Sequence, residues 1–271
     1  MYIRLLMAVI VMLLGAGWSA AEDWVQESPG QKAYYDADGN LVRVLLDTNG
    51  DKRFETEELY DGRRLSRRED LDGDGVWERQ FSWQKDGSAI LVEDRGKGAR
   101  QTTWFDDRGA MVKVEKDKDR DGHPETTWHY ERGVLQKVVK IRGTWFYKEG
   151  QMTHAEIDAD HDGRIDRKEY YRQGHLDRAD EMNVSGKVRC AWTFDGNGRP
   201  LRAEEDANGD GRREITRVYQ KDGSMSMIVD ADGNGTPELR EHYSAKGRMI
   251  SREEDLDGDG VYDLRTGRIK E

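Results

Sequence analysis

A short acidic pattern recurs along most of this chain and constrains its fold more than any other feature. Seven segments have the form D-x-[DN]-x-[DN], and they begin at Asp47, Asp70, Asp117, Asp158, Asp206, Asp230 and Asp255. Neighbouring copies lie 23 to 25 residues apart, and each of the three longer gaps corresponds to two periods. A fixed period of this length is typical of repeat proteins. We therefore expect about ten repeats, with degraded copies near residues 94–98, 141–144 and 181–185.

A second pattern lies between the acidic segments. An aromatic residue precedes a short turn that contains glycine, and an apolar residue follows, as in Tyr35–Leu41, Tyr130–Leu135 and Tyr243–Met249. Glycine supplies the positive φ angle that a tight hairpin requires. Apolar side chains alternate with polar ones on either side, which indicates strands. The sequence thus predicts an all-β fold of tandem antiparallel hairpins of 23–25 residues, forming an elongated or curled meander sheet of about twenty strands.

The first 21 residues have the pattern of a signal peptide. A basic start with Arg4 precedes ten apolar residues, Leu5–Leu14, and small residues follow up to Ala21. A membrane-spanning helix needs roughly 20 apolar residues, so we expect cleavage after Ala21 rather than an anchor. The prediction is an exported protein, periplasmic or secreted, with one repeat domain over residues 22–271 and no membrane span after cleavage.

The composition excludes some classes of function. The chain carries 44 Lys and Arg against 55 Asp and Glu, a net charge of −11, and removal of Arg4 with the signal peptide makes it −12. This acidic balance argues against a nucleic-acid partner and is compatible with cation binding. The single cysteine, Cys190, excludes an internal disulfide and a cysteine-based zinc site.

The acidic segments have the oxygen-donor spacing of a calcium loop. All seven carry an acid at the ninth place, and six carry glycine at the sixth, with Lys52 the exception. Oxygen ligands at places one, three, five and nine, with glycine at six, resemble EF-hand-type calcium loops, most closely in Asp158–Glu169. The resemblance implies a further ligand at place twelve, which only Glu58, Glu169 and Glu241 supply.

The sequences around these loops predict strands, so the resemblance covers the loop and not the helix–loop–helix fold. The loops are similar to those of secreted repeat modules such as thrombospondin type 3 repeats and dockerins. The hairpin part resembles the YD repeats of exported bacterial shell proteins and the MORN-type repeats, and neither pattern carries a reaction.

The expected cofactor is Ca²⁺, with up to seven ions, which would add +14 to the mature charge of −12 and leave +2. The predicted ligands are the acidic and amide side chains at places one, three, five, nine and, where present, twelve: Asp47, Asn49, Asp51, Glu55, Glu58, Asp70, Asp72, Asp74, Glu78, Asp117, Asp119, Asp121, Glu125, Asp158, Asp160, Asp162, Asp166, Glu169, Asp206, Asn208, Asp210, Glu214, Asp230, Asp232, Asn234, Glu238, Asp255, Asp257, Asp259 and Asp263.

Simpler interpretations compete with this one. Asp, Asn and Gly are common turn residues, and we interpret Asp36–Asn40 and Asp195–Gly198, which lack a ninth-place acid, as plain turns. No catalytic motif is evident, so we expect no enzyme activity and a structural, scaffold or adhesive role. The alternatives are a carbohydrate- or peptide-binding module with exposed tryptophans, or an accessory subunit of an envelope complex. We expect the tryptophans to form the core, and the partner to be calcium together with an envelope or extracellular protein or a glycan.

Overall fold

The structure is a computed structural model that describes residues 24–95 and 98–267. The predicted signal peptide, residues 1–21, lies outside these. The described residues form 22 strands and contain no helix, which confirms the all-β prediction. Accordingly, they include no helix that is long and apolar enough to cross a membrane. The chain divides into two compact units, residues 1–124 and 125–271, and we describe each by itself.

The first unit contains nine strands: β1 (Trp24–Ser28), β2 (Gln31–Tyr35), β3 (Leu41–Leu46), β4 (Thr56–Tyr60), β5 (Arg64–Glu69), β6 (Arg79–Trp83), β7 (Ala89–Arg95), β8 (Ala99–Phe105) and β9 (Met111–Asp117). The second contains thirteen: β10 (Thr126–Glu131), β11 (Val134–Lys140), β12 (Gly143–Lys148), β13 (Gln151–Ile157), β14 (Arg167–Arg172), β15 (His175–Met182), β16 (Val188–Phe194), β17 (Pro200–Glu205), β18 (Ile215–Tyr219), β19 (Met225–Val229), β20 (Leu239–Tyr243), β21 (Met249–Glu254) and β22 (Leu264–Gly267).

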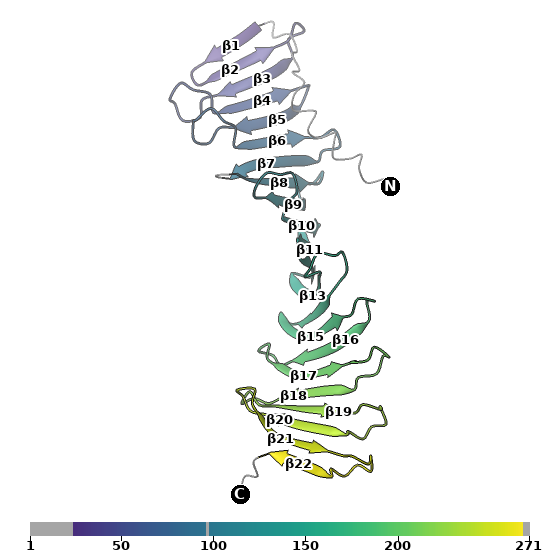
Figure 1. Ribbon diagram of the computed structural model, residues 1–271. Coiled ribbons are helices and arrows are strands. Elements are labelled where there is room, and N and C mark those ends of the chain that lie inside the picture. Colours follow the sequence, from purple (N-terminus) through teal and green to yellow (C-terminus); the bar gives the residue numbers. More distant parts are fainter. Residues whose placement is uncertain (1–23, 96–97, 268–271) are drawn as a thin grey trace. The chain divides into compact units, whose positions relative to one another are not determined.

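Within each unit, every strand pairs antiparallel with the next strand in sequence. Figure 1 shows the resulting meander, in which neighbours in sequence are neighbours in space. In such sheets each strand contacts only its two neighbours. The stability of each repeat therefore depends mainly on the repeats next to it. This arrangement confirms the prediction of tandem hairpin repeats.

Two kinds of connection alternate along the chain, at opposite ends of the strands. At one end lie tight turns, such as the type I′ turn in which Arg132 and Gly133 both have positive φ, at 50° and 77°. The acidic loops lie at the other end, together with the short turns of residues 29–30, 141–142 and 183–187. Each tight turn at the first end of the strands follows an aromatic residue, and these residues are Tyr35, Tyr60, Trp83, Phe105, Tyr130, Tyr147, Tyr171, Phe194, Tyr219 and Tyr243.

The sheet is a single layer with a thin core. The residues that are fully inaccessible are small, namely Ala155, Ala179 and Ala203, each 0% exposed. No large side chain among the described residues is fully buried. The residues opposite these alanines on the neighbouring strands have large side chains, namely Trp145, Glu169, Trp192 and Arg217.

The tryptophans do not form the buried core that the sequence suggested. Trp24 is 48% exposed, and the other tryptophans among the described residues are half-buried. Trp77 lies in an acidic loop rather than in a strand, with the Arg68 guanidinium 4.5 Å from its ring centre. The physical reason is geometric, because a sheet that has no second layer cannot enclose an indole ring.

Candidate metal centres

Two of the seven acidic loops lie in the first unit and four in the second, and the remaining one, residues 117–125, spans the boundary between the units. The six connect β3 to β4, β5 to β6, β13 to β14, β17 to β18, β19 to β20 and β21 to β22. The predicted first-, third- and fifth-place ligands therefore lie in loops at strand ends, except Asp117, which is the last residue of β9.

The first-place aspartate organises each loop. In the loop of residues 70–78, its Oδ1 accepts a hydrogen bond from Gly73 N at 2.7 Å and its Oδ2 accepts one from Gly75 N at 2.8 Å. The Oδ2 bond to the sixth-place amide occurs in all seven loops. The sixth residue has positive φ throughout, and at Lys52, the one exception to glycine, φ is 74°.

The third- and fifth-place side chains also accept hydrogen bonds from backbone amides later in the same loop. The third-place oxygen accepts a bond from the fifth-place amide, and the fifth-place oxygen accepts one from the seventh-place amide, as in Asp72–Asp74 at 3.2 Å and Asp74–Val76 at 2.8 Å. The ninth-place carboxylate closes the loop, because Glu78 Oε2 accepts from Leu71 N at 2.6 Å. These bonds turn the acidic side chains toward the inside of the loop.

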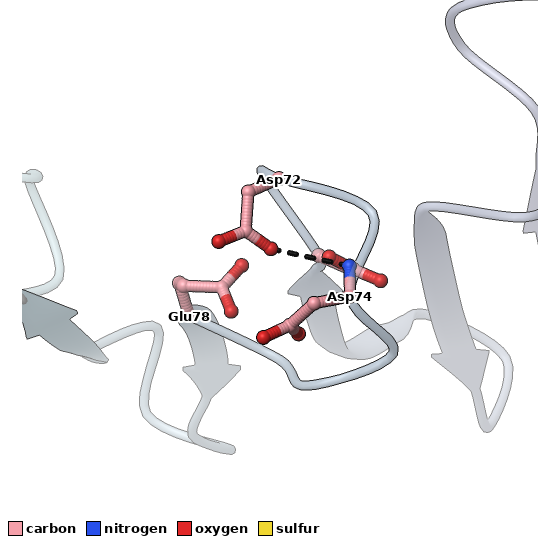
Figure 2. A group of neighbouring side chains, drawn as sticks. Asp72, Asp74 and Glu78 are labelled. Atoms are coloured by element: carbon pink, nitrogen blue, oxygen red, sulfur yellow. Dashed lines mark hydrogen bonds between the residues drawn. The ribbon is translucent and has the colours of Figure 1, made fainter.

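The acidic side chains consequently converge. In the 70–78 loop, one oxygen from each of Asp70, Asp72, Asp74 and Glu78 lies within 4.8 Å of the others. Figure 2 shows the carboxylates of Asp72, Asp74 and Glu78 facing one another. Two unit charges at 4.8 Å repel by about 3 kcal/mol at an effective dielectric constant near 20. A divalent cation would turn this repulsion into attraction.

Equivalent groups form in other loops, with some members missing. Groups of this kind that lie within a single unit include Asp47, Asp51 and Glu55; Asp158, Asp160 and Asp166; and Asp206, Asp210 and Glu214. In each group one oxygen per residue lies within 4.8 Å of the others. Asp162 is outside the second group, and its Oδ2 lies 3.8 Å from Arg164 Nε.

Several of these oxygens are buried and have no hydrogen-bond donor. Glu55 and Glu214 are each 7% exposed. Their Oε2 atoms accept from Thr48 N and Ala207 N at 2.9 Å, but their Oε1 atoms have no partner. Asp158 Oδ1 and Asp230 Oδ1 are likewise buried and unpartnered. A buried acceptor without a donor is costly, and a bound ion is one of its ordinary explanations.

The three predicted twelfth-place ligands lie in a different environment. Glu58 projects from β4 and is 4% exposed. Its carboxylate accepts a 2.5 Å hydrogen bond from Tyr60 and pairs with Arg67 at 3.2 Å. Glu169 and Glu241 are held in the same way by Tyr171 with Arg167 and by Tyr243 with Arg252. We therefore leave these three residues out of the ligand set that we propose below.

These glutamates belong to rows of alternating charge that cross the sheet face. In the first unit the row consists of Glu58, Arg67, Glu69, Arg79 and Glu93, with consecutive N–O distances of 2.7 to 3.2 Å. A similar row in the second unit consists of Glu169, Arg167, Glu181, Arg189, Glu205 and Arg217. These rows were not predicted from the sequence, although the recurring E-x-Y spacing at residues 58–60, 169–171 and 241–243 was a visible signal.

Neighbouring loops are joined directly. Asp70 N donates to Glu55 O at 2.8 Å, so the ninth residue of one loop positions the first residue of the next. The same bond links Asp230 to Glu214 and Asp255 to Glu238, at 2.9 Å each. The loops of residues 47–55 and 70–78 thus form a pair, and the three that begin at Asp206, Asp230 and Asp255 form a series.

The aspartates of the tight turns at residues 36 and 195 accept hydrogen bonds from donors within their own turns. Asp195 Oδ1 accepts from Asn197 N at 2.8 Å and from Arg199 N at 2.9 Å, and these bonds lower the pKa of its carboxyl group. Asp36 has the same arrangement, and its hydrogen bonds with Asn40 lower its pKa. Cys190 is 3% exposed, and burial raises the pKa of its thiol.

No family model matches this sequence, and no curated protein matches it significantly. Among solved structures, a crystal structure of TarM is 13% identical with a TM-score of 0.20, over 49% of this chain and 20% of that one. A crystal structure of TcdB2-TccC3 is 10% identical with a TM-score of 0.23, over 90% of this chain and 16% of that one. A Photorhabdus luminescens Tc holotoxin pore is 12% identical with a TM-score of 0.20, over 83% and 15%. The chain spans at most a fifth of the length of these three structures, and their TM-scores are too low to support a conclusion.

Proposed function

We propose that this chain is an exported, non-catalytic repeat scaffold whose acidic loops bind Ca²⁺, up to seven ions in all. The observation that carries the proposal is the pair of buried, donorless oxygens Glu55 Oε1 and Glu214 Oε1, each in a group of converging carboxylates. Turn geometry alone does not require a buried carboxylate oxygen that has no donor, whereas an ion at that point gives it a partner.

The chemistry of the donors favours calcium. The side chains that converge in these groups are carboxylates, with an asparagine amide at the third place of the 47–55 and 206–214 loops. Hard divalent cations prefer oxygen, and Ca²⁺ accepts six to eight such ligands in flexible geometry, whereas Mg²⁺ demands a nearly ideal octahedron. Backbone carbonyls and water would complete the coordination. Extracellular modules of this kind bind Ca²⁺ at roughly 10⁻⁴ to 10⁻³ M.

The physical role we propose for the ions is to hold the loop edge of the sheet together. The sheet is one layer thick and has no large buried side chain among the described residues, so it gains little from hydrophobic burial. Each ion would cross-link the ends of two strands and remove a local repulsion. A scaffold or adhesive role in the envelope, with another protein or a glycan as partner, follows from this proposal and from the predicted export.

Binding of sugars or peptides by exposed tryptophans is a weaker candidate. The ammonium group of Lys113 lies 3.7 Å from the centre of the Trp104 ring, and Arg64 lies over Trp83 at 5.6 Å. These cations occupy ring faces that a ligand would need for stacking.

The test is calorimetric titration of residues 22–271 with Ca²⁺, together with melting curves in EDTA and in millimolar Ca²⁺. We expect several bound ions and a large rise in melting temperature. Glu78→Gln should lower the stoichiometry by one ion, while Asp36→Asn, in a tight turn, should leave it unchanged. Absence of binding heat, with identical melting in both buffers, would refute the calcium proposal.

A further inference from the structure

The first and last strands of the described chain each have one edge without a strand partner. All five residues of β1 are exposed, and so are all four residues of β22. Among the described residues, β1 pairs only with β2 and β22 pairs only with β21. Such edges readily pair with another chain, and proteins commonly block them with proline, lysine or a bulge. Neither β1 nor β22 contains proline or lysine.

We propose that these two edges bind each other in different copies of the chain, so that β22 of one molecule pairs antiparallel with β1 of the next. This inference concerns a protein–protein surface and does not depend on calcium binding. The partner is a second copy because the two edges match each other in direction, in register and in charge, as follows.

The direction follows from the loop edge. Strand β22 begins at an acidic loop, residues 255–263, and β1 ends at the turn that contains Gly30. The carbonyl of Gly30 accepts a bond from Asp47 N at 2.8 Å, which is the role that Glu55 O has toward Asp70. The turn after β1 therefore lies at the loop edge. Antiparallel pairing of β1 with β22 keeps loops at one edge and tight turns at the other, as in every hairpin within each unit.

The register follows from the repeat. In the β4–β5 pair, the tenth residue counted from the start of the loop, Thr56, lies opposite Glu69, the residue before the next loop. We call the proposed contact between β22 of one copy and β1 of the next the joint. The equivalent residues at the joint are Leu264 on β22 and Ser28 on β1. Stepping one residue along each strand places Arg265 of one copy opposite Glu27 of the next.

This register continues a row of alternating charge. Arg240 pairs with Glu253 at 3.5 Å, and Glu253 pairs with Arg265 at 3.4 Å. At the other end of the chain, Glu27 pairs with Lys32 at 2.8 Å. The joint would thus produce the order plus, minus, plus, minus, plus across five strands. Directly opposed opposite charges stabilise a cross-strand pair, and like charges destabilise it.

Apolar surface supports the same joint. Trp24 and Val25 on β1 are 48% and 45% exposed, and Leu264 on β22 is 46% exposed. Pairing would remove part of this surface from water, which favours association. The contact joins two different surfaces, so it does not close on itself in a dimer, and repeated use generates a head-to-tail chain of molecules.

The test uses charge reversal in residues 22–271, with mass measured by sedimentation velocity over a wide concentration range. The unmodified protein should show a concentration-dependent rise in average mass of roughly twofold or more. The Glu27→Lys variant opposes two cations at the joint, and the Arg265→Glu variant opposes two anions. Each variant alone should stay monomeric, and each should retain the melting temperature of the unmodified protein within a few degrees, because both residues are on edge strands.

The decisive sample is an equimolar mixture of the two variants. Every joint between unlike variants again opposes a cation and an anion, so the mixture should regain association. The matched control is the Glu115→Lys variant, which changes a residue on β9, away from the joint. This variant should associate as the unmodified protein does. A protein that is monomeric throughout the range, association that survives both single reversals, or a mixture that stays monomeric would each overturn the proposal.

Discussion

Removing the ninth-place acid of one loop tests the calcium proposal most sharply. In the Glu214→Gln variant the amide oxygen can still accept from Ala207 N, as Glu214 Oε2 does at 2.9 Å. The amide nitrogen takes the place of Oε1, the buried atom that has no donor. The substitution therefore keeps the loop closed and removes one charge and one oxygen from the proposed ion site.

The expected change in stability of the Glu214→Gln variant has opposite signs with and without calcium. At about 10 mM Ca²⁺ and a dissociation constant of 10⁻⁴ to 10⁻³ M, one site contributes about 1.4 to 2.7 kcal/mol of stability, and the variant should lose it. Without calcium the variant escapes repulsion from Asp206 and Asp210, which at 4.8 Å is about 3 kcal/mol per pair before solvent screening. In EDTA it should thus melt at or above the temperature of the unmodified protein.

The assay is chemical denaturation in both buffers, followed by circular dichroism. Asp195→Asn is the control, because it lies in the tight turn of the preceding hairpin and its Oδ1 bonds to Asn197 N and Arg199 N survive the change. The control should shift stability equally in both buffers. If Glu214→Gln also destabilised the protein equally in EDTA and in Ca²⁺, its role would be structural and the reasoning about the ion would fail.

The remaining predictions concern other parts of the repeat. Glu58→Gln should leave calcium stoichiometry unchanged yet cost about 1–3 kcal/mol in either buffer, measured by denaturation, because it breaks a buried ion pair; a lost ion would return Glu58 to the ligand set. Lys52→Gly should stabilise the protein by about 1 kcal/mol, since φ at Lys52 is 74° and glycine adopts that angle freely; unchanged stability would argue against strain there. Hydrogen bonds from Ser88 lower the pKa of Asp86, so its stabilising contribution is complete above the unfolded pKa and is lost as pH falls through the folded pKa. Ser88→Ala should raise that pKa in an NMR titration, and an unchanged value would contradict the assigned cause. Ala179→Leu should lower the stability by about 1–3 kcal/mol in thermal melts, because Ala179 is 0% exposed and the larger side chain has no space there. Unchanged stability would show that the neighbouring strands shift to accommodate it.

The sequence was enough to predict the repeat because each hairpin uses local signals. The period of the acidic segments, the glycine turns and the alternation of side chains all act within one hairpin, so they predict antiparallel strands without knowledge of distant contacts. The boundaries of the acidic loops follow in the same way, since the first-place aspartate and the sixth-place residue bond within six residues of each other. The prediction that Trp104 and Trp192 form a core was wrong because burial depends on the number of layers, which no local pattern encodes.

The twelfth-place glutamates show why one spacing can have two meanings. Glu58 is the twelfth residue counted from Asp47, which is the place of a calcium ligand if the chain continues as a helix. In a strand the chain extends about 3.3 Å per residue instead of curling back, so residues beyond the ninth leave the loop. Glu58 then lies on the sheet face, where the register sets it opposite Arg67 and two residues before Tyr60. The same carboxylate that would close an EF-hand loop here stabilises a cross-strand charge row. The hydrogen-bonded geometry of the first nine residues is therefore compatible with a strand after the loop, and a return of the twelfth residue to the loop is not.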